Sequence, residues 1–152
     1  LNFNYPILFK PVKEENKLVF RKKLDNNVAV LKLFPGVTAS VVASFINIPN
    51  LKGIILETYG SGNAPTEKWF IELLEQAIGK GIYIVNVTQC AGGSVILGHY
   101  ETSSDLKRIG IVDGKNITTE TAIAKMMYLL GEKFSREEFK QYFETSLRGE
   151  IN

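Results

Sequence analysis

The sequence has few of the residues that cross-link small proteins or bind metals. Cys90 is the single cysteine of the 152 residues, which excludes an internal disulfide and any zinc site made of several cysteines. His99 is the single histidine, which leaves little room for a histidine-rich metal site. We therefore expect no metal and no cofactor.

Long hydrophobic runs are absent as well. The apolar runs extend over a handful of residues, far fewer than the roughly 20 that a membrane-spanning helix needs. No basic stretch followed by an apolar one opens the sequence, so no secretory signal is visible and no membrane partner is expected. The first residue is Leu1 rather than Met, which predicts either processing or a place within a longer protein.

Composition and charge are those of one ordinary globular domain, with 45% hydrophobic residues, 22% charged residues and a net charge of +2. Residues 1–25 hold six basic residues against three acidic ones. A basic segment favours nucleic acid, but residues 13–23 contain no Arg-rich run and a single aromatic residue, Phe20. We interpret the segment as solvated and expect no nucleic-acid partner.

Short apolar runs recur at starts 26, 28 and 27 residues apart, which is typical of buried parallel strands. These predicted strands are residues 28–34, 54–56, 82–87 and 109–112. Helical patterns fill the gaps between them and continue after the last one. The sequence therefore predicts a three-layer α/β sandwich, Rossmann-like, with a parallel sheet of about four strands.

The predicted helices carry recognisable end signals. Thr38 and Thr118 cap residues 39–46 and 119–130, Pro65 opens a helix that ends near Gly79, and Gly131 stops the fourth helix. A short helix is expected at residues 104–108, and the capping box 135–138 begins the last helix. Residues 1–25, with two prolines, are read as a connector with one edge strand, and residues 26–152 as the domain.

Polar and Gly-rich loops follow the carboxyl ends of the predicted strands, where open α/β sheets bind ligands. The Gly60-Ser61-Gly62 loop has the look of a phosphate cradle, but Pro65 stands where a dinucleotide fingerprint needs its third glycine. Nucleotide binding is therefore disfavoured. Asn63 is either a hydrogen-bonding ligand group or the N-cap of the next helix, and the residues alone favour the cap.

Cys90 would need a base to act as a nucleophile, and the single histidine lies nine residues further on with nothing that places it nearby. A small buried cysteine is the preferred interpretation. Glu101 and Asp105 are a carboxylate pair suited to acid–base chemistry or simply solvated. From these patterns alone, the chain is a small-molecule-binding α/β domain.

Several motifs occur in a fixed order along the chain. They are Ala29-Val30-Leu31-Lys32-Leu33-Phe34-Pro35-Gly36, Tyr59-Gly60-Ser61-Gly62-Asn63-Ala64-Pro65, Val87-Thr88-Gln89-Cys90, Tyr100-Glu101, Asn116-Ile117-Thr118-Thr119-Glu120-Thr121-Ala122 with Lys125 and Leu129, and Leu147-Arg148-Gly149-Glu150-Ile151. In this order and spacing they resemble the C-terminal domain of bacterial type I (cytoplasmic) L-asparaginases, from about Asp25 to Ile151.

The resemblance implies a cytoplasmic hydrolase that converts L-asparagine to aspartate and ammonia and works as a homodimer or tetramer. In that family the nucleophilic threonine and a second threonine with an aspartate and a lysine belong to an N-terminal domain, in Thr-Gly-Gly-Thr and Thr-Asp-Thr motifs. Neither motif occurs in these 152 residues. Residues 1–25 would then be an interdomain linker, and we expect the chain alone to be inactive. Preference for asparagine over glutamine stays open.

The resemblance also implies site residues. Asn63 and Glu101 match positions that hold the α-amino group of the substrate across a dimer, with Thr102 or Asp105 as alternatives to Glu101. Thr88 and Cys90 match the lining of a regulatory asparagine pocket found in some members. Those members carry an arginine where this chain has Glu57. The difference replaces a guanidinium group that can bind a carboxylate with a negative charge that repels one, and this argues against effector binding. The alternative function is a regulatory amino-acid-binding module without catalysis.

Overall fold

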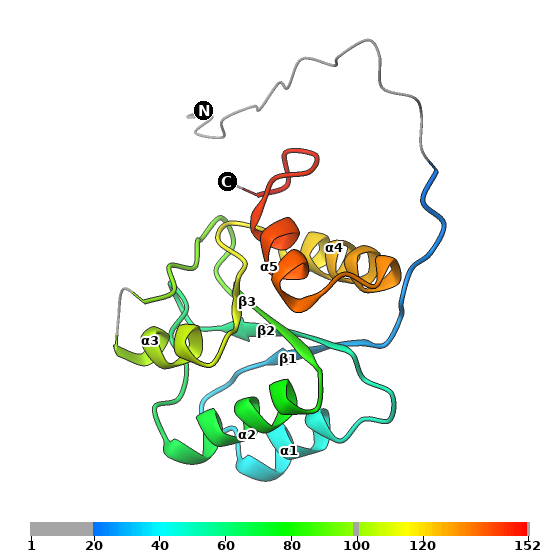
Figure 1. The fold of residues 1–152 in the computed structure, drawn as a ribbon. Helices are drawn as coiled ribbons and strands as arrows, with labels where there is room; N and C mark the ends of the chain where they lie inside the picture. Colours follow the sequence, from blue (N-terminus) through cyan, green and yellow to red (C-terminus); the bar gives the residue numbers. More distant parts are fainter. Residues whose placement is uncertain (1–19, 99–100, 152) are drawn as a thin grey trace, which may run out of the picture.

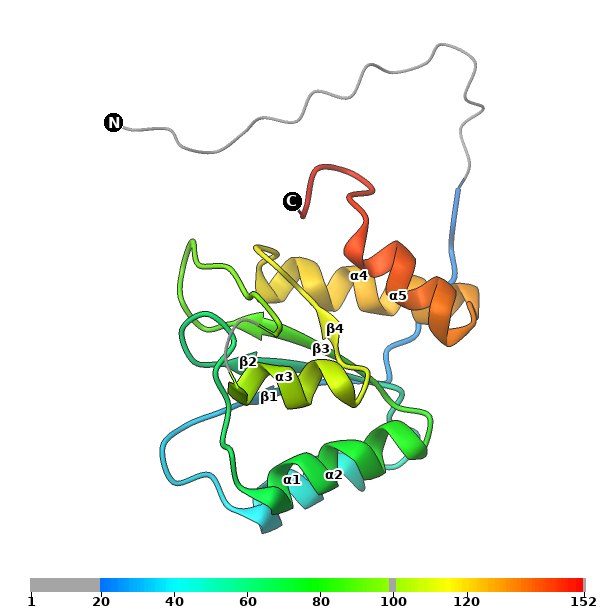
Figure 2. The ribbon, with the colours of Figure 1, turned by 60° about the vertical axis from the view of Figure 1, so that its left-hand side comes forward.

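Four parallel strands form the centre of the computed structural model, which describes residues 20–98 and 101–151. The strands are β1 (Val28–Lys32), β2 (Gly53–Thr58), β3 (Tyr83–Thr88) and β4 (Val112–Asp113). They lie side by side in chain order, β1-β2-β3-β4; Figure 1 labels the first three strands and Figure 2 all four. In-register pairing puts Val30, Ile55, Val85 and Val112 in one row across the sheet.

Helices cover both faces of this sheet, so the predicted three-layer α/β sandwich is confirmed (Figures 1 and 2). The connecting helices α1 (Ala39–Ile46), α2 (Lys68–Gly79) and α3 (Glu101–Arg108) share one face. The three β-α-β crossovers have the same hand and add strands in one direction across the sheet, which places the three connecting helices on the same face. The helices α4 (Thr119–Glu132) and α5 (Arg136–Glu144) follow β4 and cover the other face.

Each central strand supplies side chains to two cores, one on either side of the sheet. In β2, Ile54 and Leu56 pack under α1 and α2, whereas Ile55 packs under α4. In β3, Ile84 and Val85 divide in the same way. Burial on both faces explains why these strands read as continuous apolar runs in the sequence. None of the helices in the described residues is long and apolar enough to cross a membrane.

Helix caps agree with the sequence signals at three positions. The side chains of Thr38 and Thr118 accept the backbone N–H groups of Val41 and Thr121 at the starts of α1 and α4. Ser135 and Glu138 form the expected reciprocal capping box at α5. A side-chain acceptor here satisfies a helix N–H group that has no partner within the helix.

Several predicted boundaries are wrong. The fourth strand is residues 112–113 rather than 109–112, because Gly110 (φ +92°) turns the chain after α3 and Ile111 packs its side chain under that helix end. The second helix begins at Lys68, three residues after Pro65. Residues 20–24 form no strand, and the rest of the expected edge strand lies outside the described residues.

Gly131 does not end α4, as the sequence predicted, but lies inside it; the left-handed Lys133 (φ 58°) ends the helix instead. A glycine is needed at position 131 because the backbone of Lys23 and Leu24 crosses the helix close to it. A Cβ there would overlap the carbonyl group of Lys23. Around this crossing, Asp25 donates its N–H to the Met127 carbonyl at 3.0 Å, and Arg21 pairs with Glu132 at 2.6 Å. Residues 21–25 are thereby fixed along α4.

We predict that Gly131→Ala destabilises the protein, although alanine is favoured over glycine in a helix by about 1 kcal/mol. The added methyl group must push the backbone at Lys23 away from α4. Gly79→Ala at the end of α2 is the matched control, since a Cβ there meets nothing within 4 Å and should stabilise by up to ~1 kcal/mol. Urea unfolding of both variants measures the difference; equal stabilisation would contradict the close approach at 131.

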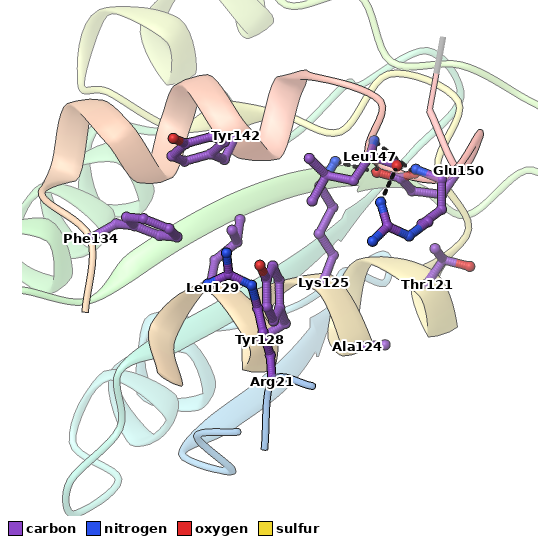
Figure 3. A pocket seen from close by; sticks show the side chains of 11 residues that line it. Arg21, Thr121, Ala124, Lys125, Tyr128, Leu129, Phe134, Tyr142, Leu147 and Glu150 are labelled. Atoms are coloured by element: carbon purple, nitrogen blue, oxygen red, sulfur yellow. Dashed lines mark hydrogen bonds and ion pairs between the residues drawn. The ribbon is translucent and has the colours of Figure 1, made fainter. Parts of the chain in front are cut away.

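The C-terminal loop is held to α4 by a buried ion pair. Lys125, 6% exposed, donates to Glu150 at 2.6 Å (Figure 3) and to the Thr145 carbonyl at 2.7 Å. The Glu150 carboxylate also accepts the backbone N–H groups of Leu147 and Arg148. Burial disfavours both charged forms. It lowers the pKa of Lys125, whereas the hydrogen bond and the negative charge of Glu150 raise that pKa but do not outweigh the burial. Burial also raises the pKa of Glu150, but the bonds from Lys125 and the backbone outweigh it and lower that pKa to about 2.

We predict that Glu150→Gln costs about 3 kcal/mol at pH 7 and that this cost disappears in acid. The pKa of the carboxyl is 4.5 when the chain is unfolded and about 2 when it is folded, so its contribution is complete above pH 4.5 and is lost as the pH falls toward 2. Unfolding titrations between pH 7 and 2 should show the two proteins converging. Glu72→Gln, an exposed residue of α2, is the control. A constant difference across this range would contradict the assignment.

Candidate functional site

The loops that follow β2, β3 and β4 emerge at one edge of the sheet, because parallel strands place their carboxyl ends together (Figure 2). Of the sequence-predicted site residues, Glu57 and Thr88 lie at the carboxyl ends of β2 and β3. Asn63 and Cys90 lie in the loops that follow these strands, and Glu101 begins α3. Two groups are formed there: a tight turn with Asn63, and a cavity with Glu57, Thr88 and Cys90.

The turn of residues 59–63 is closed on itself. Tyr59 and Asn63 exchange two backbone hydrogen bonds, at 2.8 and 2.9 Å, and Gly60 and Gly62 have φ values of +49° and +111°. The Tyr59 carbonyl also accepts the N–H of Gly62. These N–H groups are therefore directed into the turn and not toward an anion, in agreement with the argument against a phosphate cradle. The N-cap of α2 is Glu67, so the interpretation of Asn63 as that cap is wrong.

Neighbouring segments hold this turn from three sides. The Thr88 hydroxyl donates to the Gly60 carbonyl, and the Ile96 N–H donates to the Ser61 carbonyl at 3.1 Å. Below the turn, a Cβ at Gly62 would come within 2.9 Å of the Val95 side chain, so only glycine fits this packing. The backbone that carries Asn63 is consequently restrained by β3 and by the loop after it.

A buried polar pair lies under the same turn and was missed by sequence analysis. Thr58 and Asn86 are fully buried, and the Thr58 hydroxyl donates to the Asn86 Oδ1 at 2.7 Å. The Asn86 Nδ2 has no hydrogen-bond partner among the described residues, and a Cβ on Gly62 would be 3.4 Å from it. The available signal was a lone amide inside an otherwise apolar predicted strand, since buried polar side chains require partners.

Glu57, Thr88 and Cys90 line a common cavity of about 380 Å³. The Glu57 carboxylate accepts the Thr119 hydroxyl of α4 at 2.5 Å and lies 3.5 Å from the Lys32 ammonium. Cys90 donates its backbone N–H to the Thr88 hydroxyl at 3.0 Å. Its side chain is exposed, so the interpretation of a buried cysteine is wrong.

Gln89 anchors the floor of this cavity and carried no prediction. Its side-chain amide donates to the carbonyls of Leu33 and Glu57, at 2.7 and 2.9 Å. The backbone N–H of Gln89 donates to the backbone carbonyl of Thr58. One residue thus connects the ends of β1, β2 and β3, and the loop after β3 starts from a fixed point.

Glu101 is the first residue of α3, and Asp105 follows four positions later in the same helix. Asp105 pairs with Arg108 at 3.3 Å. His99 and Tyr100 lie outside the described residues. No three His, Cys, Asp or Glu side chains gather into a metal site within residues 20–98 and 101–151. Asn63 does not line the Glu57 cavity, so the turn and the cavity are separate features joined through Thr88.

The sequence profile of one protein family, described as the glutaminase/asparaginase C-terminal domain, matches residues 27–143. The chain belongs to this family. The match begins just before β1 and ends within α5, and so covers every strand of the described sheet.

Individual relatives agree with this assignment. L-asparaginase 1 of Escherichia coli is 36% identical over 137 residues, which are 90% of this chain and 40% of that protein. The 60 kDa lysophospholipase of Mus musculus is 38% identical over 138 residues, 90% of this chain and 24% of that protein. This asparaginase-type domain therefore spans less than half the length of these curated relatives.

A solved structure shows the same fold. L-asparaginase I from Vibrio cholerae superposes with a TM-score of 0.80 at 34% sequence identity, over 86% of this chain and 39% of that one. The three-layer sandwich described above is thus also present in a part of a larger asparaginase.

Proposed function

We propose that this domain is the C-terminal part of an L-asparaginase that hydrolyses L-asparagine to aspartate and ammonia. The observation that carries the proposal is the family match over residues 27–143, together with relatives named L-asparaginase at 36% and 34% identity. The nucleophilic threonines would come from an N-terminal domain joined through residues 1–25, and the enzyme would work in the cytoplasm as a homodimer or tetramer. The 152 residues alone would not release ammonia from asparagine.

Asn63 and Glu101 would hold the substrate rather than react with it. The α-ammonium group of asparagine needs acceptors, which a carboxylate and an amide oxygen supply, and the amide nitrogen can donate to the α-carboxylate. The restrained turn supports this role for Asn63, because a ligand group on a fixed backbone loses little freedom on binding. Glu101 is the first residue of α3, the helix that follows β3.

A regulatory amino-acid-binding module is the second candidate. The cavity with Glu57, Thr88 and Cys90 supports it, since all three residues line one space of suitable size for a small ligand. Glu57 stands where the resemblance implies an arginine that binds the carboxylate of the effector, so at this position its own carboxylate would oppose an amino-acid effector. A relative named lysophospholipase also contains this domain, so the domain by itself does not select asparagine.

We predict that Asn63→Ala and Glu101→Ala in the full-length enzyme each raise the KM for asparagine about 10- to 100-fold. Loss of one hydrogen bond to a charged group costs roughly 1.5–3 kcal/mol, which corresponds to this range. Because both residues are proposed to bind the α-amino end of asparagine and not its scissile amide, kcat should change less. Steady-state kinetics measure both constants, with Thr102→Ala and Asp105→Ala as comparison variants. Unchanged KM in Asn63→Ala and Glu101→Ala would remove both assignments.

We predict no saturable binding of asparagine to the 152-residue chain up to millimolar ligand, because Glu57 repels the α-carboxylate. Glu57→Arg should create binding by offering a guanidinium fork, whereas Glu57→Gln, which removes only the charge, should not reach the same affinity. Isothermal titration calorimetry on the three proteins decides this. Saturable binding to the unchanged chain would favour the regulatory module.

A further inference from the structure

The two buried polar side chains of the described sheet, Thr58 and Asn86, lie beneath the turn of residues 59–63. Both are 0% exposed and, by strand alternation, lie on the sheet face that α1 and α2 cover. The Thr58 hydroxyl donates to the Asn86 Oδ1 at 2.7 Å and lies 3.1 Å from the Val87 carbonyl. The Asn86 Nδ2 has no hydrogen-bond partner among the described residues. A buried donor without a partner disfavours folding, so stability does not explain this amide.

Asn86 meets the turn at Gly62, the residue before Asn63. A Cβ on Gly62 would be 3.4 Å from the Asn86 Nδ2 and 2.9 Å from the Val95 side chain, so these two side chains form the floor on which the glycine lies. Gly62 has a φ of +111°, a backbone conformation that residues with a side chain rarely adopt. The amide of Asn86 is therefore one peptide unit away from the residue that we propose to bind the substrate.

The two halves of the turn are held in different ways. Hydrogen bonds from two neighbouring segments end on the carbonyls of Gly60 and Ser61, in the first half. Gly62 donates its N–H within the turn, and its support from outside is packing, with Asn86 as the polar contact. A displacement of the Asn86 amide would therefore move Gly62 and Asn63 while the first half of the turn stays bonded.

Thr58 determines which way the Asn86 amide faces. An amide presents an acceptor on one side and a donor on the other, and a half-turn about its last side-chain bond exchanges them. With the oxygen on the Thr58 hydroxyl, the nitrogen is directed to Gly62. Valine at position 58 would have nearly the same shape but no hydroxyl, so the amide would lose the bond that fixes its orientation.

We propose that Asn86, oriented by the Thr58 hydroxyl, is a positioning residue for substrate binding. It fixes the peptide between Gly62 and Asn63 so that the Asn63 side chain meets the α-amino end of asparagine. This inference rests on the proposed function of Asn63. Thr58 and Asn86 are fully buried, so they act through the turn and not on the substrate itself. Loss of the orientation would weaken the binding of asparagine more than its hydrolysis once bound.

Kinetics of the full-length enzyme test the proposal. Thr58→Val should raise the KM for asparagine about five-fold and change kcat less than about two-fold, because it weakens binding of the substrate and of the transition state alike. Thr58→Ser keeps the hydroxyl and should leave KM within about two-fold of the unchanged enzyme. Val85→Ala, a core truncation in the same strand as Asn86 but on the opposite face, is the matched control; it lowers stability and should leave KM unchanged. Equal KM in Thr58→Val and Thr58→Ser would overturn the proposal.

A double-mutant cycle separates this inference from the proposed function. In the Asn63→Ala background, Thr58→Val should cause no further rise in KM, since the residue that it positions is gone. A full further rise there would overturn the inference, because Thr58 would then act by another route. Unchanged KM in Asn63→Ala would overturn the substrate role of Asn63 and this inference with it. A raised KM in Asn63→Ala beside an unchanged KM in Thr58→Val would overturn this inference alone.

Amide hydrogen exchange of the 152-residue chain gives a readout that needs no activity. In Thr58→Val the N–H groups of Gly62 and Asn63 should exchange about ten-fold faster than in Thr58→Ser, because the floor of the turn is no longer fixed. The rates are compared with that of the Ile82 N–H, which bonds to the Ala77 carbonyl at the other end of β3 and should not differ between the variants. Equal exchange of the two turn amides in both variants would overturn the proposal.

Discussion

The parallel register of β1, β2 and β3 is the constraint on which the candidate site depends. It sets Lys32 opposite Glu57 and Thr58 opposite Thr88, within the last two residues of the three strands. From these positions Glu57 reaches Lys32 and α4, and Thr88 reaches the turn after β2. A slip of one residue would direct every one of these side chains to the other face of the sheet, so the two apolar cores that fix the register also fix the chemistry at its edge.

Polar hydrogen bonds then attach the loops at this edge to the ends of the strands. Gln89 joins three strand ends through its amide, and Thr88 is shared by the turn with Asn63 and the cavity with Cys90. Loops that carry function are usually more mobile than the helices and strands they connect. Here the backbone carbonyls of Gly60 and Ser61 are both bonded to other segments, so Asn63 is presented from a base that has little freedom to adapt. That arrangement suits recognition of one small, fixed ligand group.

The sequence was sufficient for the layers of the fold and for the helix starts, because strand burial and N-capping are read from neighbouring residues. Thr38, Thr118 and Ser135 cap as expected for this reason. The predictions that were wrong concern residues whose contacts lie far away in the sequence. Gly131 looked like a helix stop, yet it is required by a backbone that crosses from more than 100 positions earlier. Asn63 likewise looked like a cap, whereas its position follows from Thr88, Ile96 and Asn86, which only the folded chain brings together.

Helix α4 connects the two outer features of the domain. Its first turn reaches the cavity through Thr119 and Glu57, its middle binds the C-terminal loop through Lys125, and its last turn touches the crossing chain at Lys23. A translation of the helix along its axis would lengthen the Thr119 bond and at the same time force Gly131 against, or away from, that chain. The position of α4 is therefore set from both ends, by the Thr119 bond to Glu57 at its start and by the crossing chain at Gly131 near its end.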